Sequence, residues 1–260
     1  MRCSPMTHPQ RERERVTSAT AHTLYDSLLD HTLQAWDIVP TETSTPHTPR
    51  LRFRGFTDPW QRTQLGEMFD FEIPHNSLSR NDLTSEKRGV RNVHYGDILI
   101  TYGSVLDCNV DMIPYIKDES YQPATNALLK DGDIIFADTA EDNTAGKAVE
   151  IRQVQENLIV AGLHTIVARP MNCFAPCFLG YGLNSNAFRK QTNPILQGTK
   201  VLSISKGFLS DTYLYYPSTF AEQKQIGAFF RSQDEGIATA TEQIDKLKRI
   251  KQACLKQMFV

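Results

Sequence analysis

The clearest alternation of apolar and polar positions lies near the end of the chain, where apolar side chains return every three or four residues. The seven core positions of this repeat are Ile237, Ala240, Ile244, Leu247, Lys251, Cys254 and Met258. Such spacing is the heptad pattern of a coiled coil, and it predicts one long amphipathic helix over residues 221–260. The opposite face is charged, with Glu242, Asp245, Lys246, Lys248, Arg249 and Lys256.

The apolar face of this helix has to be covered by something. A partner helix would cover it in a dimer or in a docked complex. Because about three heptads is short for a coiled coil, an ordinary surface helix packed on its own domain is the other interpretation. Residue spacing by itself leaves both open.

Residues 50–220 show a different pattern, in which short apolar runs alternate with turn residues. The predicted strand segments are Tyr95–Val105, Lys130–Asp142, Leu158–Pro170 and Gly198–Leu209. The first two share one device, a Gly-Asp turn followed by a short apolar run. Apolar residues three and four apart predict one helix within residues 176–190. We therefore expect an α+β fold, with a β-rich domain followed by one long helix.

The first 49 residues form a separate segment. Four leucines at helical spacing predict a helix from about residue 20 to residue 36, and a linker with three prolines, PTETSTPHTPR, follows it. We expect a loosely attached arm, whose helix could equally cap the domain or bind a partner. The domain then begins with an entry segment that aromatic and apolar residues pin to a core, namely Phe53, Phe56, Trp60, Leu65 and Phe69.

Length and composition limit the class of protein. A chain of 260 residues with 40% hydrophobic content can hold one globular domain with appendages but no second full domain. No apolar run approaches the roughly 20 residues that span a bilayer, and the Arg-rich start lacks the apolar core of a signal peptide. Five scattered cysteines do not form a disulfide framework. We expect a cytoplasmic protein that makes no contact with a membrane.

A net charge of −2 argues against a protein that coats nucleic acid indiscriminately. Such binding depends on neutralising many phosphates. The charge leaves room for a sequence reader, which needs only a few well-placed basic side chains and can share phosphate contacts with a partner subunit.

Two enzymatic interpretations can be tested against the sequence. The stretch Phe178 to Gly182 has the F-x-G-x-G form of methyltransferases that bind S-adenosylmethionine, but the chain contains no Pro-Pro and hence no loop of the kind that holds a flipped base. Asp133, Asp138 and Lys147 come nearest to a magnesium-dependent nuclease site, yet no E/D-x-K triplet follows in a strand. We expect the acidic residues to serve turns, and the two glycines to let a helix pack closely.

The sequence signals for a zinc site and for a catalytic nucleophile are equally weak. Cys173 and Cys177 with His164 upstream lack a fourth zinc ligand, so we expect two buried thiols. His164 has no serine in a strained turn and no activated cysteine to serve as a base. The sequence therefore predicts no catalytic residues and no metal site in this chain.

What remains is a binding surface made of polar and cationic loops. The candidate DNA-binding residues fall in three stretches: Arg80, Asn81, Lys87, Arg88 and Arg91; Asn143 and Lys147; and Gln197, Thr199, Lys200, Ser203 and Lys206. Arg and Lys side chains can read guanine, and Asn and Gln can read adenine. Each residue taken singly is also consistent with an ordinary solvated loop.

The closing helix resembles the conserved helical region of specificity (S) subunits of Type I restriction-modification systems. The residues that carry this resemblance are Glu222, Gln223, Ile226, Phe229, Phe230, Asp234, Ile237, Ile244, Leu247, Lys248, Lys251, Met258 and Phe259. Further phrases in the same order resemble the family: Trp60 with Leu65, Gly66 and Glu67; Gly132 to Ile135 with Gly146 and Lys147; Gly162 to Thr165; Arg169 and Pro170; Gln197 to Ser205. The resemblance covers roughly residues 51–259.

This resemblance implies a division of labour. It makes residues 50–220 a target-recognition domain for double-stranded DNA, and residues 221–260 a conserved helix for dimerisation and for docking methyltransferase subunits. Adenine methylation would fall to those modification subunits, and cleavage to an ATP-driven restriction and translocase subunit. The cofactors S-adenosylmethionine, ATP and Mg²⁺ would sit on these partners and none on this chain.

Family members usually carry two recognition domains and two conserved helices, so this chain resembles a form with a single recognition domain. Two copies joined through their helices would restore the usual arrangement and read an interrupted palindrome. Residues 1–49 depart from the family, because they contain no Leu-Lys-x-x-Lys phrase. Two other interpretations stay open: a free-standing dimeric DNA-binding regulator, and a fragment of a fused methyltransferase.

Overall fold

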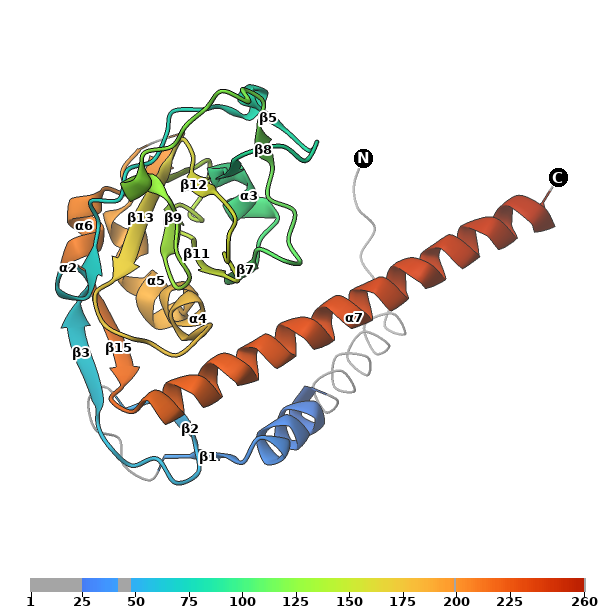
Figure 1. Ribbon diagram of the computed structural model, residues 1–260. Helices are drawn as coiled ribbons and strands as arrows, with labels where there is room; N and C mark the ends of the chain where they lie inside the picture. Colours follow the sequence, from blue (N-terminus) through green and yellow to red (C-terminus); the bar gives the residue numbers. More distant parts are fainter. Residues whose placement is uncertain (1–24, 42–47, 199, 260) are drawn as a thin grey trace, which may run out of the picture. The chain divides into compact units, whose positions relative to one another are not determined.

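The computed structural model of the protein describes residues 25–41, 48–198 and 200–259. The chain divides into two compact units, Met1–Asp58 and Pro59–Val260. Figure 1 shows the elements of both units in the colours of the sequence. Each unit has its own fold.

The first unit contains a helix and a hairpin. Its helix covers residues 25–35, which confirms the described part of the predicted helix, while residues 20–24 lie outside the described residues. Strands β1 (Ile38–Pro40) and β2 (Leu51–Phe53) then pair antiparallel around a segment that is mostly outside the described residues. The Trp36 and Phe53 rings meet edge to face with centroids 6.5 Å apart. Phe53 thus packs within the first unit.

A five-stranded sheet forms the centre of the second unit. Its strands are, in spatial order, β4 (Phe69–Asp70), β13 (Thr165–Pro170), β9 (Ile134–Ala137), β11 (Ala148–Arg152) and β7 (Val105–Asp107). Only β11 and β7 run parallel; the other neighbours are antiparallel. Every residue of β9 is buried, as expected for a central strand that is covered on both faces.

A second sheet has four strands and lies at another part of the same unit (Figure 1). Its spatial order is β12 (Ile159–Ala161), β6 (Arg91–Val93), β8 (Tyr115–Ile116) and β5 (Leu83–Thr84). Two ribbons complete the strand pairing: β3 (Trp60–Gln64) with β15 (Tyr213–Pro217), and β10 (Thr139–Ala140) with β14 (Leu202–Ser203). The β-rich α+β expectation is confirmed.

Short helices cover the first sheet on one face. They are α2 (Leu65–Met68), α4 (Phe178–Asn184), α5 (Asn186–Thr192) and α6 (Lys206–Asp211). Three 3-10 turns complete the unit: η1 (Arg80–Asp82), η2 (Thr125–Ala127) and η3 (Asn193–Ile195). The core between these helices and the sheet includes Leu65, Phe136, Leu179 and Phe188, all almost fully buried.

The predicted helix of residues 176–190 is present as two helices. Ser185 ends α4 and caps α5, because its hydroxyl accepts a hydrogen bond from the Phe188 N–H. Gly180 is required at its position, since a Cβ there would overlap the Ser104 carbonyl oxygen and approach Glu150. Gly182 has ordinary space around it. The expectation that glycine permits close helix packing holds for Gly180.

Two buried charged groups tie the helices and strands together. The carboxylate of Glu150, on β11, accepts hydrogen bonds from the backbone N–H groups of Cys177 and Gly180 at 2.7 and 2.9 Å. Burial raises the pKa of Glu150. Asp133 accepts two hydrogen bonds from the Arg169 guanidinium, at 2.8 and 2.7 Å. Asp133 does follow a turn, whereas Glu150 lies inside a strand and organises the start of α4, which sequence reasoning did not foresee.

The prediction of a strand at Tyr95–Val105 was wrong over its first half. Residues Tyr95–Ile100 form helix α3, and only Val105 begins β7. The imidazole of His94 accepts a hydrogen bond from the Gly96 N–H and so caps the helix. Residues 134–137 form the predicted strand β9, because β11 and β13 pair with it on both sides. The same Gly-Asp device therefore starts a helix in one place and a strand in the other.

The segment Gly198–Leu209 was also only partly a strand. Residues Leu202–Ser203 form β14, after which α6 begins at Lys206. The Ser205 hydroxyl accepts from the Phe208 N–H and caps this helix. The predicted segment Leu158–Pro170 contains the two strands β12 and β13.

The chain ends in the predicted long helix, α7 (Phe220–Met258). Thr219 caps its start by accepting from the Glu222 N–H. Its first turns pack against α4 and β15, and Figure 1 shows the helix continuing well past these elements. Gly227 permits the close approach, because a Cβ there would overlap the Pro176 carbonyl oxygen. Tyr181 on α4 donates a hydrogen bond of 2.6 Å to Asp234 on α7.

Candidate nucleic-acid interface

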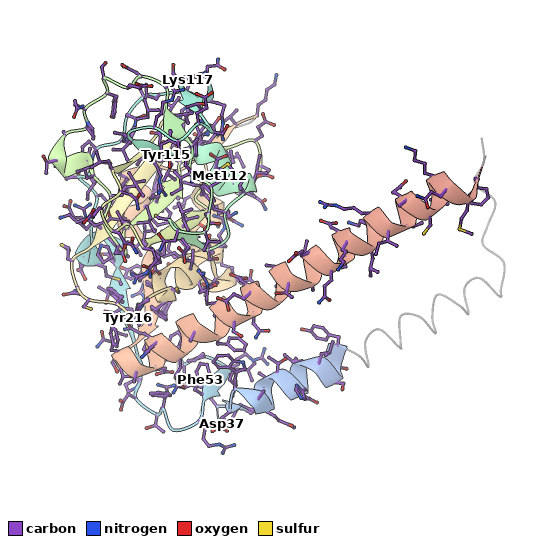
Figure 2. All side chains as sticks on the ribbon, turned by 45° about the vertical axis from the view of Figure 1, so that its right-hand side comes forward. Asp37, Phe53, Met112, Tyr115, Lys117 and Tyr216 are labelled. Atoms are coloured by element: carbon purple, nitrogen blue, oxygen red, sulfur yellow. The ribbon has the colours of Figure 1, made fainter. Side chains whose placement is uncertain are left out.

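The first predicted basic stretch lies around η1 and the four-stranded sheet. Arg80 forms an ion pair with Asp97, and its guanidinium lies 3.5 Å from the His94 ring. The Asn81 side chain is on the surface, and its carbonyl oxygen accepts from Lys117. Figure 2 shows Lys117 and Tyr115 at the end of the unit far from Tyr216. This stretch is therefore remote from the ribbon beside which α7 begins.

Two arginines of this stretch serve the fold. Arg91 donates to the Cys108 carbonyl and to the Asn157 side chain, both at 2.8 Å. Arg88 forms ion pairs with Glu86 and with Glu119. Their charges are thus used within the domain, although both guanidinium groups remain partly exposed. Lys87, in contrast, is exposed and makes no ion pair with another described residue.

In the second stretch, too, the charged side chain forms its hydrogen bonds within the fold. The Lys147 ammonium donates to the carbonyl oxygens of Leu99 and Tyr102, at 3.3 and 2.8 Å, and burial lowers its pKa. The Asn143 side chain is exposed, while its carbonyl oxygen accepts from Arg189. Lys147 consequently holds the turn after α3 in place, a role that its position in a loop-like sequence did not indicate.

The third stretch surrounds β14. Gln197 and Ser203 exchange two backbone hydrogen bonds, of 3.0 and 2.8 Å, and close a tight loop between them. Lys200 is exposed at the tip of this loop, and Thr199 lies outside the described residues. Lys206 approaches the exposed carboxylate of Glu72 to 3.8 Å. This stretch offers cations at the surface.

The structure brings the second and third stretches together. Thr139 and Ala140 of β10 pair with Ser203 and Leu202 of β14, and the Ile204 N–H donates to the Asp138 carbonyl at 2.8 Å. The loop of residues 141–147 lies between these strands and β11. The two stretches therefore occupy adjoining loops.

A cluster of aromatic and charged side chains links these loops to the first stretch. From Arg80 the contacts run to His94, whose ring centroid is 4.7 Å from that of Tyr95, and on to His164 at 5.3 Å from Tyr95. His164 then lies 3.3 Å from the Asp138 carboxylate. Together Arg80, His94, Tyr95, His164 and Asp138 form what we call the histidine cluster. It links the first stretch, through Arg80, to Asp138, which directly precedes β10.

Sequence reasoning considered His164 as a zinc ligand and as a base for a nucleophile, and it did not consider His94 or Tyr95. His164 has a φ of 58°, a left-handed conformation that is uncommon for a residue with a side chain, and its imidazole is 45% exposed. Burial lowers the pKa of His94, and the nearby Arg80 charge acts in the same direction. No periodicity marks these residues, since they meet from separate parts of the chain: His94 and Tyr95 begin α3, and His164 directly precedes β13.

The enzymatic alternatives gain nothing from the geometry. Among the described residues no group of three His, Cys, Asp or Glu side chains is arranged to hold a metal ion. The Asp133 carboxylate accepts hydrogen bonds from Arg169, and the Lys147 ammonium donates to two backbone carbonyls. The expectation of two buried thiols was wrong for Cys173, which is exposed, and Cys177 is half-buried.

The partner-helix residues lie on one exposed face of α7. Ile237, Ile244 and Leu247 are 64, 52 and 65% exposed. The other core positions of the heptad repeat are exposed as well, namely Ala240, Lys251, Cys254 and Met258. Within the described part of the chain, nothing covers this face.

An apolar groove of about 410 Å³ lies where α7 leaves the domain. Ile226 and Phe230 line it from α7, Trp60 and Tyr213 from the β3–β15 ribbon, and Phe178 from α4. Within this ribbon the Arg62 guanidinium stacks over the Tyr213 ring, 3.4 Å from its centroid. Sequence reasoning did not foresee the groove, because its walls come from segments far apart in the chain.

We compared the chain with known protein families and with known proteins. No family model matches the chain. It is 25% identical over 212 residues to the putative type I restriction enzyme MjaX specificity subunit of Methanocaldococcus jannaschii, a match that covers 77% of this chain and 48% of that protein.

Solved structures agree in fold. The S subunit of a Type I restriction-modification system from M. genitalium superposes with a TM-score of 0.52 at 12% identity, over 83% of this chain and 48% of that one. A chain from a study of complex assembly and conformational transition of the type I R-M system gives a TM-score of 0.52 at 19% identity, over 96% of this chain and 56% of that one.

The chain thus spans about half the length of the proteins it matches. The matches extend over most of its own length. No helix in the described residues is long and apolar enough to cross a membrane. The sequence match and the agreement in fold confirm the resemblance read from the residues: this chain is similar, over most of its length, to specificity (S) subunits of Type I restriction-modification systems.

Proposed function

We propose that this chain is the DNA sequence-recognition subunit of a Type I restriction-modification complex. The observation that carries the proposal is the agreement with S subunits over most of the chain, which includes both the β-rich domain and α7. In this role residues 50–220 read double-stranded DNA and α7 connects the reader to its partners.

The chain supplies the address, and separate subunits supply the chemistry. Methyltransferase subunits dock on α7 and methylate adenine, and a restriction and translocase subunit cleaves DNA. S-adenosylmethionine, ATP and Mg²⁺ are bound by these partners. This division is supported by the use of Asp133 and Lys147 within the fold, which leaves neither for a nuclease site.

The DNA face is narrower than the sequence suggested. It comprises surface side chains of the first and third stretches, Tyr95 and His164 of the histidine cluster, and Lys117 beside Asn81. The full set is Arg80, Asn81, Lys87, Lys117, Tyr95, His164, Gln197, Lys200 and Lys206. Arg91 and Lys147 act from behind this face by holding its loops. A face with few cations suits a subunit that specifies sequence while partners share the phosphate contacts.

Two copies of the chain form a homodimer through α7. Support comes from the apolar face of this helix, which is uncovered over several turns although the rest of the unit has a normal core. A two-fold dimer presents two identical reading domains, so its target is an interrupted palindrome.

The free-standing regulator is the second candidate, because an uncovered apolar helix also suits a dimer that needs no enzyme. The two candidates separate when the full chain is purified gently from its native cells and its companions are identified by mass spectrometry. A near-stoichiometric adenine methyltransferase is expected. A chain that returns alone, dimeric and bound to DNA would overturn the proposal in favour of the regulator.

A fused methyltransferase fragment makes a different prediction. Such a chain would bind S-adenosylmethionine by itself, whereas the proposed subunit gives no heat of binding with that cofactor in calorimetry. Mapping methylated adenines in the native genome adds a test of symmetry. A strictly asymmetric methylated site would refute the homodimer but leave the recognition role standing.

A further inference from the structure

A polar pocket of about 340 Å³ lies where the β-rich domain meets α7. Its lining includes Ser104 from the turn after α3, Lys147 from the loop of residues 141–147, Asn184 from α4, Arg189 from α5 and Asp234 from α7. None of these side chains belongs to the DNA face defined above. The pocket is therefore a separate polar site, and two cations share it.

These two cations have no carboxylate partner among the described residues. Arg189 donates to two backbone carbonyls of the loop of residues 141–147, and Lys147 donates to two carbonyls at the end of α3. Neither forms an ion pair with a described carboxylate, and the exposed Asp142 acts on Arg189 from beyond ion-pair distance. Burial lowers the pKa of both cations. A half-buried cation without a counter-ion is unfavourable, and a second one on the same pocket adds repulsion.

The unused hydrogen-bonding capacity around these cations consists of donors. Each cation donates to two carbonyls, which leaves one N–H of the Lys147 ammonium and several of the Arg189 guanidinium. Ser104 Oγ accepts from the Asn184 amide at 3.4 Å, so its own O–H remains available. The Asn184 amide is already occupied by backbone groups of α4 and β11. A ligand that satisfies these donors has to accept hydrogen bonds and carry negative charge.

The charge balance of the lining selects a singly charged anion. Asp234 contributes a carboxylate, which accepts a hydrogen bond of 2.6 Å from Tyr181. Two cations and one carboxylate leave one positive charge. A phosphodiester carries one negative charge, and its unesterified oxygens suit arginine and lysine donors. A nucleotide with several phosphates would bring excess negative charge close to Asp234.

Two walls of the pocket continue into the proposed DNA face. Helix α3 begins at Tyr95, which belongs to the histidine cluster, and ends shortly before Ser104. The loop of residues 141–147 directly follows β10, whose partner β14 comes after the exposed Lys200. A DNA backbone that passes along this face therefore comes close to the pocket.

Building on the proposed function, we infer that this pocket binds one phosphate of the DNA backbone at the junction of the β-rich domain and α7. Arg189, Lys147 and the Ser104 hydroxyl donate to its oxygens. Phosphate contacts fix the position and register of a protein on the duplex without reading sequence. A phosphate held here fixes the DNA relative to α7, and so relative to any subunit docked on that helix.

Ser104→Asp tests the pocket by supplying the negative charge from within the chain. Ser104→Asn is the matched control, because it has nearly the same size as the aspartate variant and no charge. Dimethyl phosphate, a small phosphodiester, should raise the melting temperature of the full-length chain above its value in sodium chloride of equal ionic strength. Ser104→Asp should melt higher than Ser104→Asn and lose the response to dimethyl phosphate, whereas Ser104→Asn should retain it.

A second variant makes the test independent of how well one variant folds. Arg189→Gln removes a cation from the pocket and keeps an amide that can donate to the loop of residues 141–147. It should lose the response to dimethyl phosphate as Ser104→Asp does. Circular dichroism establishes that each variant is folded before it is compared.

Methylphosphonate scanning of a target duplex locates the phosphate. The chain is assembled with its methyltransferase subunits, and single phosphates of the duplex are replaced by neutral methylphosphonates. The Ser104→Asp complex should bind the unmodified duplex at least about tenfold more weakly than the Ser104→Asn complex, because a hydrogen bond to a charged group contributes about that much or more. Its salt dependence should be shallower by about one contact. At one linkage in each half-site the methylphosphonate should weaken the unchanged complex and leave the Ser104→Asp complex unaffected.

The outcomes separate this inference from the proposed function. If the effects of Ser104→Asp and of the methylphosphonates add at every linkage while the complex still binds its site, the phosphate contact is refuted and the recognition role stands. A response to dimethyl phosphate with equal DNA affinity of the two Ser104 variants would make the ligand a free anion and exclude DNA as its source. Absence of any response to dimethyl phosphate in the unchanged chain, with equal DNA affinity of the variants, would overturn the pocket itself. A complex that selects no duplex would refute the proposed function and, with it, DNA as the ligand.

Discussion

Replacing Leu247 with aspartate should dissociate the proposed homodimer and leave the β-rich domain folded. Leu247 lies in the middle of the exposed face of α7 and is 65% exposed in the single chain. It belongs to the part of the helix beyond the turns that pack on α4 and β15. A change there alters the free energy of association and not the free energy of unfolding of the domain.

The size of the effect follows from the area that dimerisation covers. Full burial of a leucine side chain contributes about 1.5–3 kcal/mol, so covering its exposed two-thirds contributes roughly 1–2 kcal/mol per copy. Two-fold symmetry counts this twice, giving roughly 2–4 kcal/mol for the dimer. At about 1.4 kcal/mol for each tenfold change, the Kd should rise at least about thirtyfold. Burying the aspartate charge raises it further.

Sedimentation equilibrium over a range of concentrations measures this Kd, and circular dichroism checks the fold. Ala253→Asp is the matched control, because it introduces the same charge and a similar loss of helix propensity on the opposite face of α7. The control should dimerise like the unchanged chain.

Two results would refute the reasoning. A Kd for Leu247→Asp within about threefold of the control would mean that this face is not the interface. Loss of the cooperative unfolding transition of the domain would mean that α7 stabilises it through this residue, contrary to the exposure of the side chain.

Three further predictions concern the domain. Glu150→Gln leaves one backbone N–H at the start of α4 without an acceptor, so urea denaturation should show a free energy of unfolding lower by about 1–3 kcal/mol. Burial raises the pKa of Glu150, which means that ionisation of this carboxyl opposes folding. The stability difference between the unchanged chain and the variant should therefore be largest below the ordinary pKa of 4.5 and shrink as pH rises. Gly180→Ala should cost at least about 1–3 kcal/mol by overlap, whereas Gly182→Ala should be neutral or stabilising; equal melting temperatures would contradict this. Lys200→Ala should weaken DNA binding by the assembled complex and reduce the salt slope by about one, while Lys147→Ala should lower stability; unchanged affinity at all salt concentrations would remove Lys200 from the DNA face.

The sequence predicted the features that depend on local order. Heptad spacing identified α7, because a helix exposes its periodicity in the chain itself. The short apolar run Ile134–Ala137, which follows a Gly-Asp turn, identified β9, because this signal also lies within a few neighbouring residues. Ordered phrases such as Gly132 to Ile135 indicated the resemblance to S subunits, since they are read without knowing the contacts they make.

Other features were decided by groups distant in the chain. Tyr95–Ile100 became a helix although it contains the same Gly-Asp pair that precedes β9, because His94 caps it. Lys147 was predicted as a DNA contact, and only the structure places its ammonium on the carbonyls of Leu99 and Tyr102. The residue type alone does not tell whether a side chain forms hydrogen bonds within the fold or faces solvent.

The recognition surface shows the limit most clearly. The sequence alone determined that the chain holds a β-rich domain, a long helix with one apolar face and a set of polar loops. Only the tertiary structure decided which loops adjoin, through the β10–β14 pairing and the histidine cluster, and where the apolar face of α7 meets a groove. The physical reason is that periodicity reports the nearest neighbours of each residue along the chain. A binding surface is made by residues that meet only after the chain has folded.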